Sequence, residues 1–575
     1  MLKFVFDRTL VSAKKVMFIK SKRIIFSAAI ILLALTGADA YAQTLKHVTY
    51  ADPVYHFLDR AYARKWILFL PTTKPYTEKQ VYALLNEALS EYKASPEKFS
   101  QRDIDELLFH IGRISGDKFS LLSVEEDKFT ASLNIAPYTG FNMALDTPSD
   151  TATAIGADLI IDLTLANAFY LGLKTDQHLI VETWKNSPYR KFHEPHFPDF
   201  NMYTYNLATG ETGFNHMANR SEDNDLSIRM NQFNQMSIDL NLATVSFGRN
   251  AFMWGPSQFS NSFLSNTAKP YEYFLLDIPF GKRISFNWMT GFLRNREELR
   301  SEDDGRKMIS THKFEIQVTD WFMFSFYETV IYAPKFELAY LNPFSLYYIS
   351  EVAQGDYDNK LGGFDFMFRF PPTVVYLSLY FDDWNFGKLF DPSYYNNMII
   401  TTLGTRYYDL IPGLTITVEL TYINHWTYTH ATPNNYTHYG ANLGHVLEPN
   451  SYMVYLDLKY DHSLKLTYGF SFWFTQHGYG SINTHPNDVG WDVGGAYPEG
   501  TKNYKFLDHG IAGIYRVTDL DLTIYTEYRI PHYGVKLGAA LSAAYNRNIA
   551  DGYSNLPGGD RWKSFLTLSA KWQAY

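Results

Sequence analysis

Apolar and polar residues alternate in long stretches from about Phe129 to Ala574, and this period of two constrains the fold more than any other feature of the chain. The segment from Ser451 to Thr475 shows the pattern clearly. Its alternate positions form an apolar set and a more polar set, which are Tyr452, Val454, Leu456, Leu458 and Tyr460 against Met453, Tyr455, Asp457 and Lys459. A period of two places the two sets on opposite faces of a β-strand.

The polar set is too charged for a dry core. Between Asp519 and Ile530, the acids Asp519, Asp521 and Glu527 alternate with aliphatic and aromatic residues. Charges are costly in an apolar interior but acceptable in the water-filled lumen of a membrane barrel, whose outer face is apolar. The sequence therefore predicts an all-β transmembrane barrel over residues 125–575, antiparallel, with an even number of strands between about 14 and 20.

Candidate wall strands carry this alternation along most of the chain. They are Phe129–Ile135, Leu159–Leu165, Phe169–Leu173, Ile284–Trp288, Phe314–Val318, Phe322–Phe326, Phe364–Phe370, Val375–Phe381, Leu414–Tyr422, the 451–475 hairpin, Leu520–Tyr528 and Val535–Tyr545. Longer polar and aromatic segments separate some of them, and we expect these to be extracellular loops. They are Asn186–Asp225, Asn295–Arg306, Asp382–Asn397, Asn424–Asn450 and Gln476–Lys505.

Residues 1–42 have the pattern of a secretory signal peptide. A basic stretch ending at Arg23 precedes the short apolar run Ile24–Leu35, and Ala40-Tyr41-Ala42 offers the small residues that signal peptidase requires. We expect cleavage after Ala42. Export and a barrel together predict a location in the cell outer membrane, with outer-membrane lipid and the barrel-assembly machinery as partners.

Residues 43–120 differ from the barrel because their apolar residues recur at helical spacing. The pattern predicts three helices, over Pro53–Tyr62, over Glu78–Lys93 after an N-cap at Thr77, and after a second N-cap at Ser100. We expect a small periplasmic α-helical module that either stands free or docks on the periplasmic mouth of the barrel.

Composition and motifs narrow the function. The chain has no cysteine, which excludes disulfides and thiolate metal sites, and its formal net charge of −9 gives no basic footprint for nucleic acid. The sequence holds neither a G-x-S-x-G nucleophile motif nor a phosphate-binding loop. Adjacent acids such as Asp382-Asp383 would point to opposite faces of a strand and make poor acid–base pairs. We therefore expect no catalysis and no cofactor.

One composite motif stands out just before the middle of the chain. Its residues are Gly248, Arg249, Trp254, Gly255, Pro256, Leu264, Ser265, Asn266 and Pro270. Two later stretches accompany it, Glu328 to Tyr332 with Tyr340 to Pro343, and Gly363-Phe364-Asp365. This set resembles the signature of the capsule assembly protein Wzi family. The resemblance implies an outer-membrane barrel of about 18 strands and a lectin-like role in attaching capsular polysaccharide to the cell surface.

Two features of this region have open interpretations. Arg249 shares the lipid-facing parity of Phe247, so it either turns into the lumen at an irregularity or reaches the membrane interface. In the lumen, it would hold a loop or plug carboxylate or contact the ligand directly. Trp254-Gly255-Pro256 is expected to form a tight turn.

The loop Asn424–Asn450 combines four histidines, His425, His430, His438 and His445, with four aromatic residues, Trp426, Tyr428, Tyr436 and Tyr439. The histidine spacings match no known pair of metal ligands, so we expect no metal. The aromatic residues are a candidate glycan-binding loop, because ring faces suit the C–H faces of sugars. The alternative is a solvated loop rich in tyrosine.

The sequence thus predicts an outer-membrane protein that binds or assembles surface polysaccharide without catalysis. A passive diffusion channel of the porin type is the alternative. A channel would have an open lumen, whereas a polysaccharide anchor would be plugged.

Overall fold

The computed structural model describes residues 44–115, 120–126, 128–145, 151–166, 168–182, 203–206, 212–214, 226–294, 306–333, 337–355, 358–382, 386–388, 398–424, 426–430, 434–439, 441–481, 514–530, 534–549 and 559–572. The predicted signal peptide lies outside these residues. No helix within the described ranges is long and apolar enough to cross a membrane.

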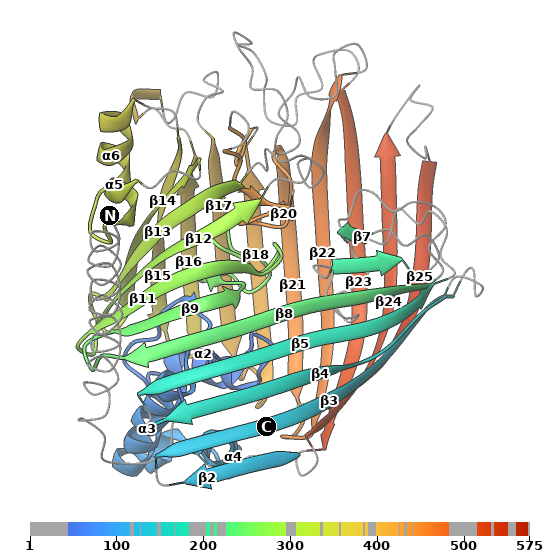
Figure 1. The fold of residues 1–575 in the computed structure, drawn as a ribbon. Helices are drawn as coiled ribbons and strands as arrows, with labels where there is room; N and C mark the ends of the chain where they lie inside the picture. Colours follow the sequence, from blue (N-terminus) through green and yellow to red (C-terminus); the bar gives the residue numbers. More distant parts are fainter. Residues whose placement is uncertain are drawn as a thin grey trace, which may run out of the picture.

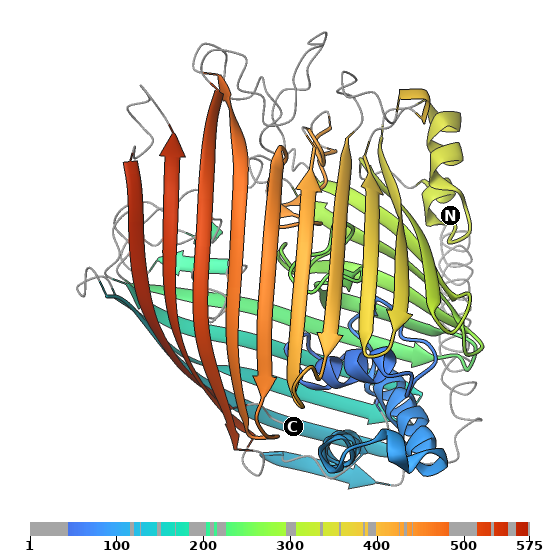
Figure 2. The same cartoon turned by 180° about the vertical axis from the view of Figure 1, so that it is seen from behind.

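Eighteen wall strands of the described chain form one closed antiparallel barrel (Figures 1 and 2), as predicted. Each strand pairs with its neighbours in chain order, and the last pairs with the first. The strands are β3 (Phe129–Ala144), β4 (Thr151–Leu165), β5 (Phe169–Glu182), β8 (Leu226–Asp239), β9 (Thr244–Asn250), β11 (Tyr271–Phe280), β12 (Ile284–Arg294), β13 (Arg306–Gln317), β14 (Phe322–Tyr332), β15 (Asn359–Phe370), β16 (Thr373–Phe381), β17 (Ile399–Tyr408), β18 (Leu414–Ile423), β21 (Ser451–Asp461), β22 (Leu466–Ser481), β23 (Ile514–Ile530), β24 (Val535–Ile549) and β25 (Gly559–Trp572).

Short strands add to this wall or lie inside it. β2 (Leu122–Glu126) pairs with β3, and β6 (Tyr203–Asn206) pairs with both β7 (Thr212–Phe214) and β8. Two further two-stranded pairs stand apart from the wall, β1 (Thr73–Lys74) with β10 (Met253–Trp254), and β19 (Thr437–His438) with β20 (Ala441–Asn442).

The alternation in the sequence sets which side chains face outward. Leu420 and Ile524 are exposed on the outer face, whereas Glu419 and Asp521 are buried on the inner face of the same strands. In β11 polar and apolar residues do not alternate clearly, because the inner face carries buried aromatic residues such as Tyr271 in place of polar ones. This explains why β11 was not among the candidate strands.

The strand register makes a direct prediction in β21. Leu456 lies between Val418 of β18 and Phe472 of β22 on the outer face, while its neighbour Asp457 lies between two inner-face residues. Leu456→Arg should lower the free energy of unfolding by about 2–4 kcal/mol if the site is near the bilayer midplane. Asp457→Arg should have a much smaller effect. Guanidinium unfolding in lipid vesicles tests the pair, and equal losses would contradict the register.

Three helices precede the barrel, at positions close to those predicted. They are α2 (Val54–Ala63), α3 (Glu78–Ala94) and α4 (Gln101–Ser115), with a 3-10 turn, η1 (Pro96–Lys98), between the last two. The Thr77 side chain caps α3 by accepting from the backbone N–H of Gln80, and Ser100 and Asp103 form the corresponding reciprocal pair at α4. Both caps satisfy backbone donors that a helix start leaves free.

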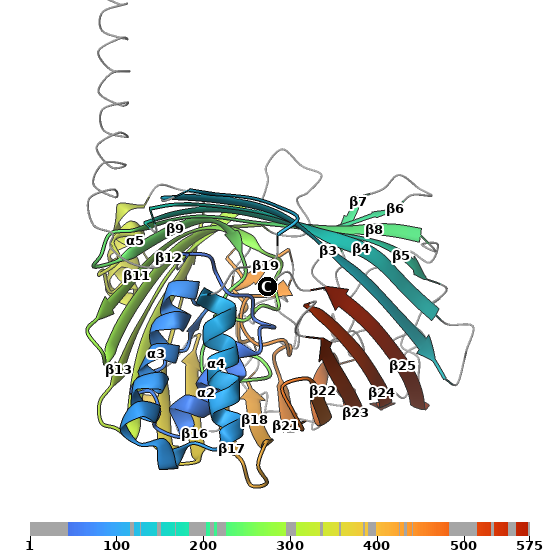
Figure 3. The same cartoon turned by 90° about the horizontal axis from the view of Figure 1, so that it is seen from below.

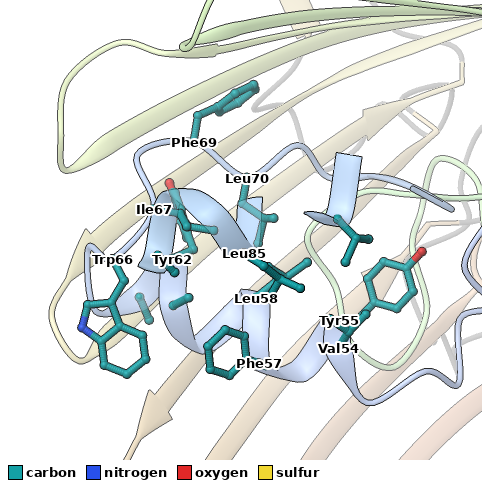
Figure 4. Close-up of a cluster of buried hydrophobic side chains, with 14 of the residues drawn as sticks. Val54, Tyr55, Phe57, Leu58, Tyr62, Trp66, Ile67, Phe69, Leu70 and Leu85 are labelled. Carbon is teal, nitrogen blue, oxygen red and sulfur yellow. The ribbon is translucent and has the colours of Figure 1, made fainter. Parts of the chain in front are cut away.

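The helical module docks inside the barrel, at the end where the wall strands are joined by short turns (Figure 3). This end is the periplasmic one in outer-membrane barrels. Apolar residues of α2 and α3 form one core (Figure 4), which inward-facing residues of the wall such as Met323 and Tyr408 complete. Arg369 of β15 donates to the backbone oxygens of Tyr62 and Ile67, at 3.1 and 2.9 Å, and so binds the end of α2 to the wall.

Long connections join the strands at the opposite end. The connection between β14 and β15 contains two helices, α5 (Leu338–Leu341) and α6 (Tyr347–Gln354). These helices lie outside the barrel wall, beside β13 and β14 (Figure 1). The connection between β18 and β21 instead enters the lumen.

Candidate functional site

The signature segment leaves β9 and folds into the lumen. Gly248 has φ +155°, and a Cβ there would lie 2.1 Å from the backbone oxygen of Asn234 on the next strand. Gly255 has φ +147°, and its Cβ would meet the side chain of Asn261 at 2.3 Å. Both positions therefore require glycine. Trp254 is buried in β10, where it pairs with β1 of the helical module, and Trp254-Gly255-Pro256 is a buried bend rather than the expected tight turn.

Glu419 fixes the bend that follows Pro256. This carboxylate is fully buried on the inner face of β18, and it accepts from the backbone N–H groups of Gln258 and Phe259 at 2.5 and 3.2 Å. The hydroxyl of Tyr376 donates to it as well. Glu419 was missed in the sequence. The available signal was a lone acid among the inward-facing threonines of β18, which marks a polar contact inside the barrel.

The second half of the signature is held by backbone bonds. The N–H of Trp254 donates to the oxygen of Leu264 at 2.9 Å, and that of Ser265 donates to the oxygen of Leu443 at 2.7 Å. Leu264, Ser265 and Pro270 are buried, whereas Asn266 is exposed. Asn266 is thus the signature residue in this half that water can reach.

Arg249 is on the outer face of β9, with the same parity as Phe247. Its guanidinium donates to Glu272, the directly opposite residue on β11, at 2.8 Å. The expectation that Arg249 holds a carboxylate in the lumen is therefore wrong. No bulge intervenes between Phe247 and Arg249, because β9 and β11 pair residue by residue through this stretch. Arg249 therefore stays on the outer face, where it pairs with Glu272.

The candidate glycan-binding loop is also inside the barrel. Trp426, Tyr428 and Tyr436 are fully buried and Tyr439 is 7% exposed. The hydroxyls of Tyr428 and Tyr436 donate to the backbone oxygens of Ser262 and Phe263, at 2.5 and 2.7 Å. Their rings therefore pack against the signature segment. Burial contradicts both the exposed sugar platform and the solvated loop expected from the sequence.

The loop also has an unusual backbone conformation at three of its aromatic residues. Trp426, Tyr428 and Tyr439 all have positive φ values between 51° and 72°. Such angles are unfavourable for bulky residues and persist where surrounding contacts fix them. The loop and the signature segment together form one buried unit, which we call the lumen plug (described residues within 251–270 and 424–450).

A buried lysine connects the lumen plug to the wall. The ammonium of Lys307 on β13 donates to the backbone oxygen of Asn435 at 2.6 Å and to the hydroxyl of Thr437 at 3.2 Å. Lys307 is fully buried, so a cation that faces water in most barrels is used here to hold a loop.

Two histidines of the lumen plug accept hydrogen bonds from backbone N–H groups. His438 Nδ1 accepts from the N–H of Arg294 at 3.1 Å, and His445 Nδ1 accepts from the N–H of Leu447 at the same distance. His425 lies outside the described residues. Within the described residues, no group of three or more His, Asp or Glu side chains could hold a metal ion.

The barrel and its interior define a class of protein, an outer-membrane β-barrel whose lumen is occupied by a helical module and an inward-folded plug. The family model for the capsule assembly protein Wzi matches residues 217–494, which include the whole lumen plug and most of the strands around it. This part of the chain is similar to the Wzi family.

Several solved structures are similar to this chain, one of them with a TM-score above 0.5. The carbohydrate-binding barrel Wzi of Escherichia coli, an outer-membrane protein involved in group 1 capsule assembly, superposes with a TM-score of 0.55 at 13% identity, covering 93% of this chain and 100% of that one. OprD of Pseudomonas aeruginosa gives a TM-score of 0.40 at 9% identity, covering 77% and 92%. OccAB2 of Acinetobacter baumannii gives 0.41 at 7% identity, covering 77% and 98%. No curated protein matches the sequence.

Burial of the plug histidines predicts sensitivity to acid. Burial lowers the pKa of His445 to about 3, and burial with nearby cations lowers the pKa of His438 well below its usual range. A lowered pKa means that the folded state favours the neutral ring, whereas the unfolded chain takes up a proton near pH 6.5. The free energy of unfolding therefore decreases as the pH falls below about 6.5. For His445 alone, the loss at pH 4.5 should be about 2–3 kcal/mol.

Unfolding of the wild type at pH 7 and pH 4.5, compared with His445→Gln, measures this effect. The amide variant should lose less stability on acidification than the wild type does. An identical loss in both proteins would show that His445 is not the sensitive group.

Proposed function

We propose that the protein binds surface polysaccharide of the capsular type at the outer face of the outer membrane, and takes part in its assembly without catalysis. The observation that carries this proposal is the position of the family match. Residues 217–494 supply the lumen plug and most of the strands around it. The described structure therefore favours a closed scaffold over an open pore, and E. coli Wzi is described as a carbohydrate-binding barrel.

The buried plug rings are poorly placed to meet a polymer, because they pack against the signature segment. We therefore assign polysaccharide contact to the long connections at the mouth opposite the helical module. The main ones join β5 to β8, β12 to β13, β16 to β17 and β22 to β23.

Binding of host surface polysaccharide to the detergent-purified protein tests the proposal. Four variants would each carry one shortened connection, within 186–222, 296–304, 384–396 or 484–511, closed by a short Gly-Ser linker. The control is Lys98→Glu, an exposed position in the helical module at the other mouth. A heat-modifiable band on gels would confirm that each barrel is folded.

We expect saturable binding by the wild type and by Lys98→Glu, and loss of binding in at least one shortened variant. An absence of binding to every host glycan fraction would overturn the proposed function. Undiminished binding by all four shortened variants would overturn the assignment of the contact to these connections.

A further inference from the structure

Residues 337–355, which we call the outer hairpin, lie against the outside of the barrel rather than above its mouth (Figures 1 and 2). The hairpin contains α5 and α6, and α6 contacts β14 and β15. The ring of Phe344, between the two helices, stacks on that of Phe286 of β12 with centroids 5.0 Å apart. The outer hairpin therefore covers part of the wall that would otherwise face lipid.

The covered wall is unusually polar. His312 and Glu328 face outward from β13 and β14 and form a pair at 3.2 Å. The backbone N–H of Tyr347 in α6 donates to Glu328 at 3.2 Å. The hydroxyl of Tyr347 accepts from the Trp288 indole at 2.8 Å. Ionisable side chains on the lipid face of a barrel are destabilising unless they are covered and paired.

A second contact involves a cation on the outer face. Lys360 of β15 binds Glu351 of α6 at 2.6 Å, and Glu351 is 1% exposed. Glu351, the one charged residue of α6, thus faces the wall beside the buried ring of Tyr347. A helix on a water-exposed surface usually has its charged residues on the outer side.

The other side of the hairpin is apolar and exposed. Its side chains are between 50% and 70% exposed, and they are Leu338, Phe344, Leu346, Tyr348, Ile349 and Val352. The sequence has no charged residue from 338 to 350. The outward-facing Phe274 and Phe292 on β11 and β12 are also exposed, so this apolar surface continues the lipid-facing surface of the barrel.

We propose that the outer hairpin lies within the outer leaflet of the membrane, with its apolar face in contact with lipid acyl chains. The exposed apolar side chains of α6, the inward position of its one charged residue and the continuity with the lipid-facing wall all point to lipid as the occupant. The hairpin thereby shields the His312–Glu328 pair and holds the extracellular end of β14 and β15 at the membrane surface. This inference does not depend on what the protein binds outside the cell.

Site-directed spin labelling tests the proposal cleanly, because the chain has no native cysteine. Ile349→Cys and Val352→Cys place a label on the exposed face of α6 without disturbing a buried contact. Leu403→Cys, on the outer face of β17, is the lipid-facing control, and Ser90→Cys, on the exposed side of α3, is the water-facing control. Each protein would be reconstituted in dimyristoylphosphatidylcholine vesicles, and collision rates with oxygen and with a water-soluble nickel chelate would be compared.

We expect the oxygen-to-nickel ratio at residues 349 and 352 to match that at residue 403 and to exceed that at residue 90 several-fold. A ratio equal to that at residue 90 would overturn the proposal, because the hairpin would then face water. Protection from both reagents would also overturn it, because another protein or a second copy of this chain would then cover the face.

Discussion

Lys313→Met should lower the free energy of unfolding by about 3–5 kcal/mol, because it removes one partner from a buried network of charges. Lys313 is fully buried on the inner face of β13. Its ammonium lies 2.6 Å from Asp365 of β15, 2.7 Å from the hydroxyl of Thr72 and 3.9 Å from Glu315. The substitution would leave two buried carboxylates without their cation.

The same network holds the segment after α2, because Glu315 accepts from the N–H and the hydroxyl of Thr72 at 2.9 and 2.6 Å. Lys313→Met should therefore also expose the helical module to protease. The control is the triple variant Lys313→Met, Glu315→Gln and Asp365→Asn, which removes all three charges and should recover much of the loss. Guanidinium unfolding in vesicles measures both, and a loss below about 1 kcal/mol in the single variant would contradict this account.

Trp254→Ala should lower the free energy of unfolding by about 3–5 kcal/mol, the usual range for removing a buried aromatic ring. Trp254 is 1% exposed and packs with Phe252 and Phe263, at ring-centroid distances of 6.2 and 6.0 Å. Its strand β10 pairs with β1, so the substitution should loosen the lumen plug from the helical module. Trp562→Ala, at an outward and exposed position, should lose much less.

This prediction separates a structural role for the signature from a ligand role. Polysaccharide binding per folded molecule should be unchanged in Trp254→Ala, because the ring is enclosed. A variant of normal stability that loses its affinity for polysaccharide would instead show that Trp254 contacts the ligand.

The wall and the helical module could be predicted because their signals are local. The alternation around Leu456 and the cap at Thr77 each depend on a few neighbouring residues, and the structure has both as expected. The outer hairpin was not predicted as helical. The sequence signal was weak, because its two helices are short and many of their apolar side chains face away from the protein.

The lumen plug could not be predicted because it is determined by contacts distant in sequence. A loop with Tyr428 and Tyr436 has the composition of a surface loop, and its burial depends on the oxygens of Ser262 and Phe263 more than 160 residues earlier. Glu419 likewise acts on the bend at Gln258 from 161 residues away. For Arg249 the sequence left two positions open, and the regular pairing of β9 with β11 selects the outer face.

The most direct test of the central claim, a plugged barrel that binds polymer rather than a pore, is the electrical conductance of the wild-type protein in planar lipid bilayers. The same recordings on Ser90→Cys, labelled with a dye at this exposed position of the helical module, would verify that the protein inserts. The occupied lumen predicts no large, steady single-channel current, even where labelled protein is clearly present. Steady currents of uniform size from the wild type would contradict the account and favour a passive diffusion channel.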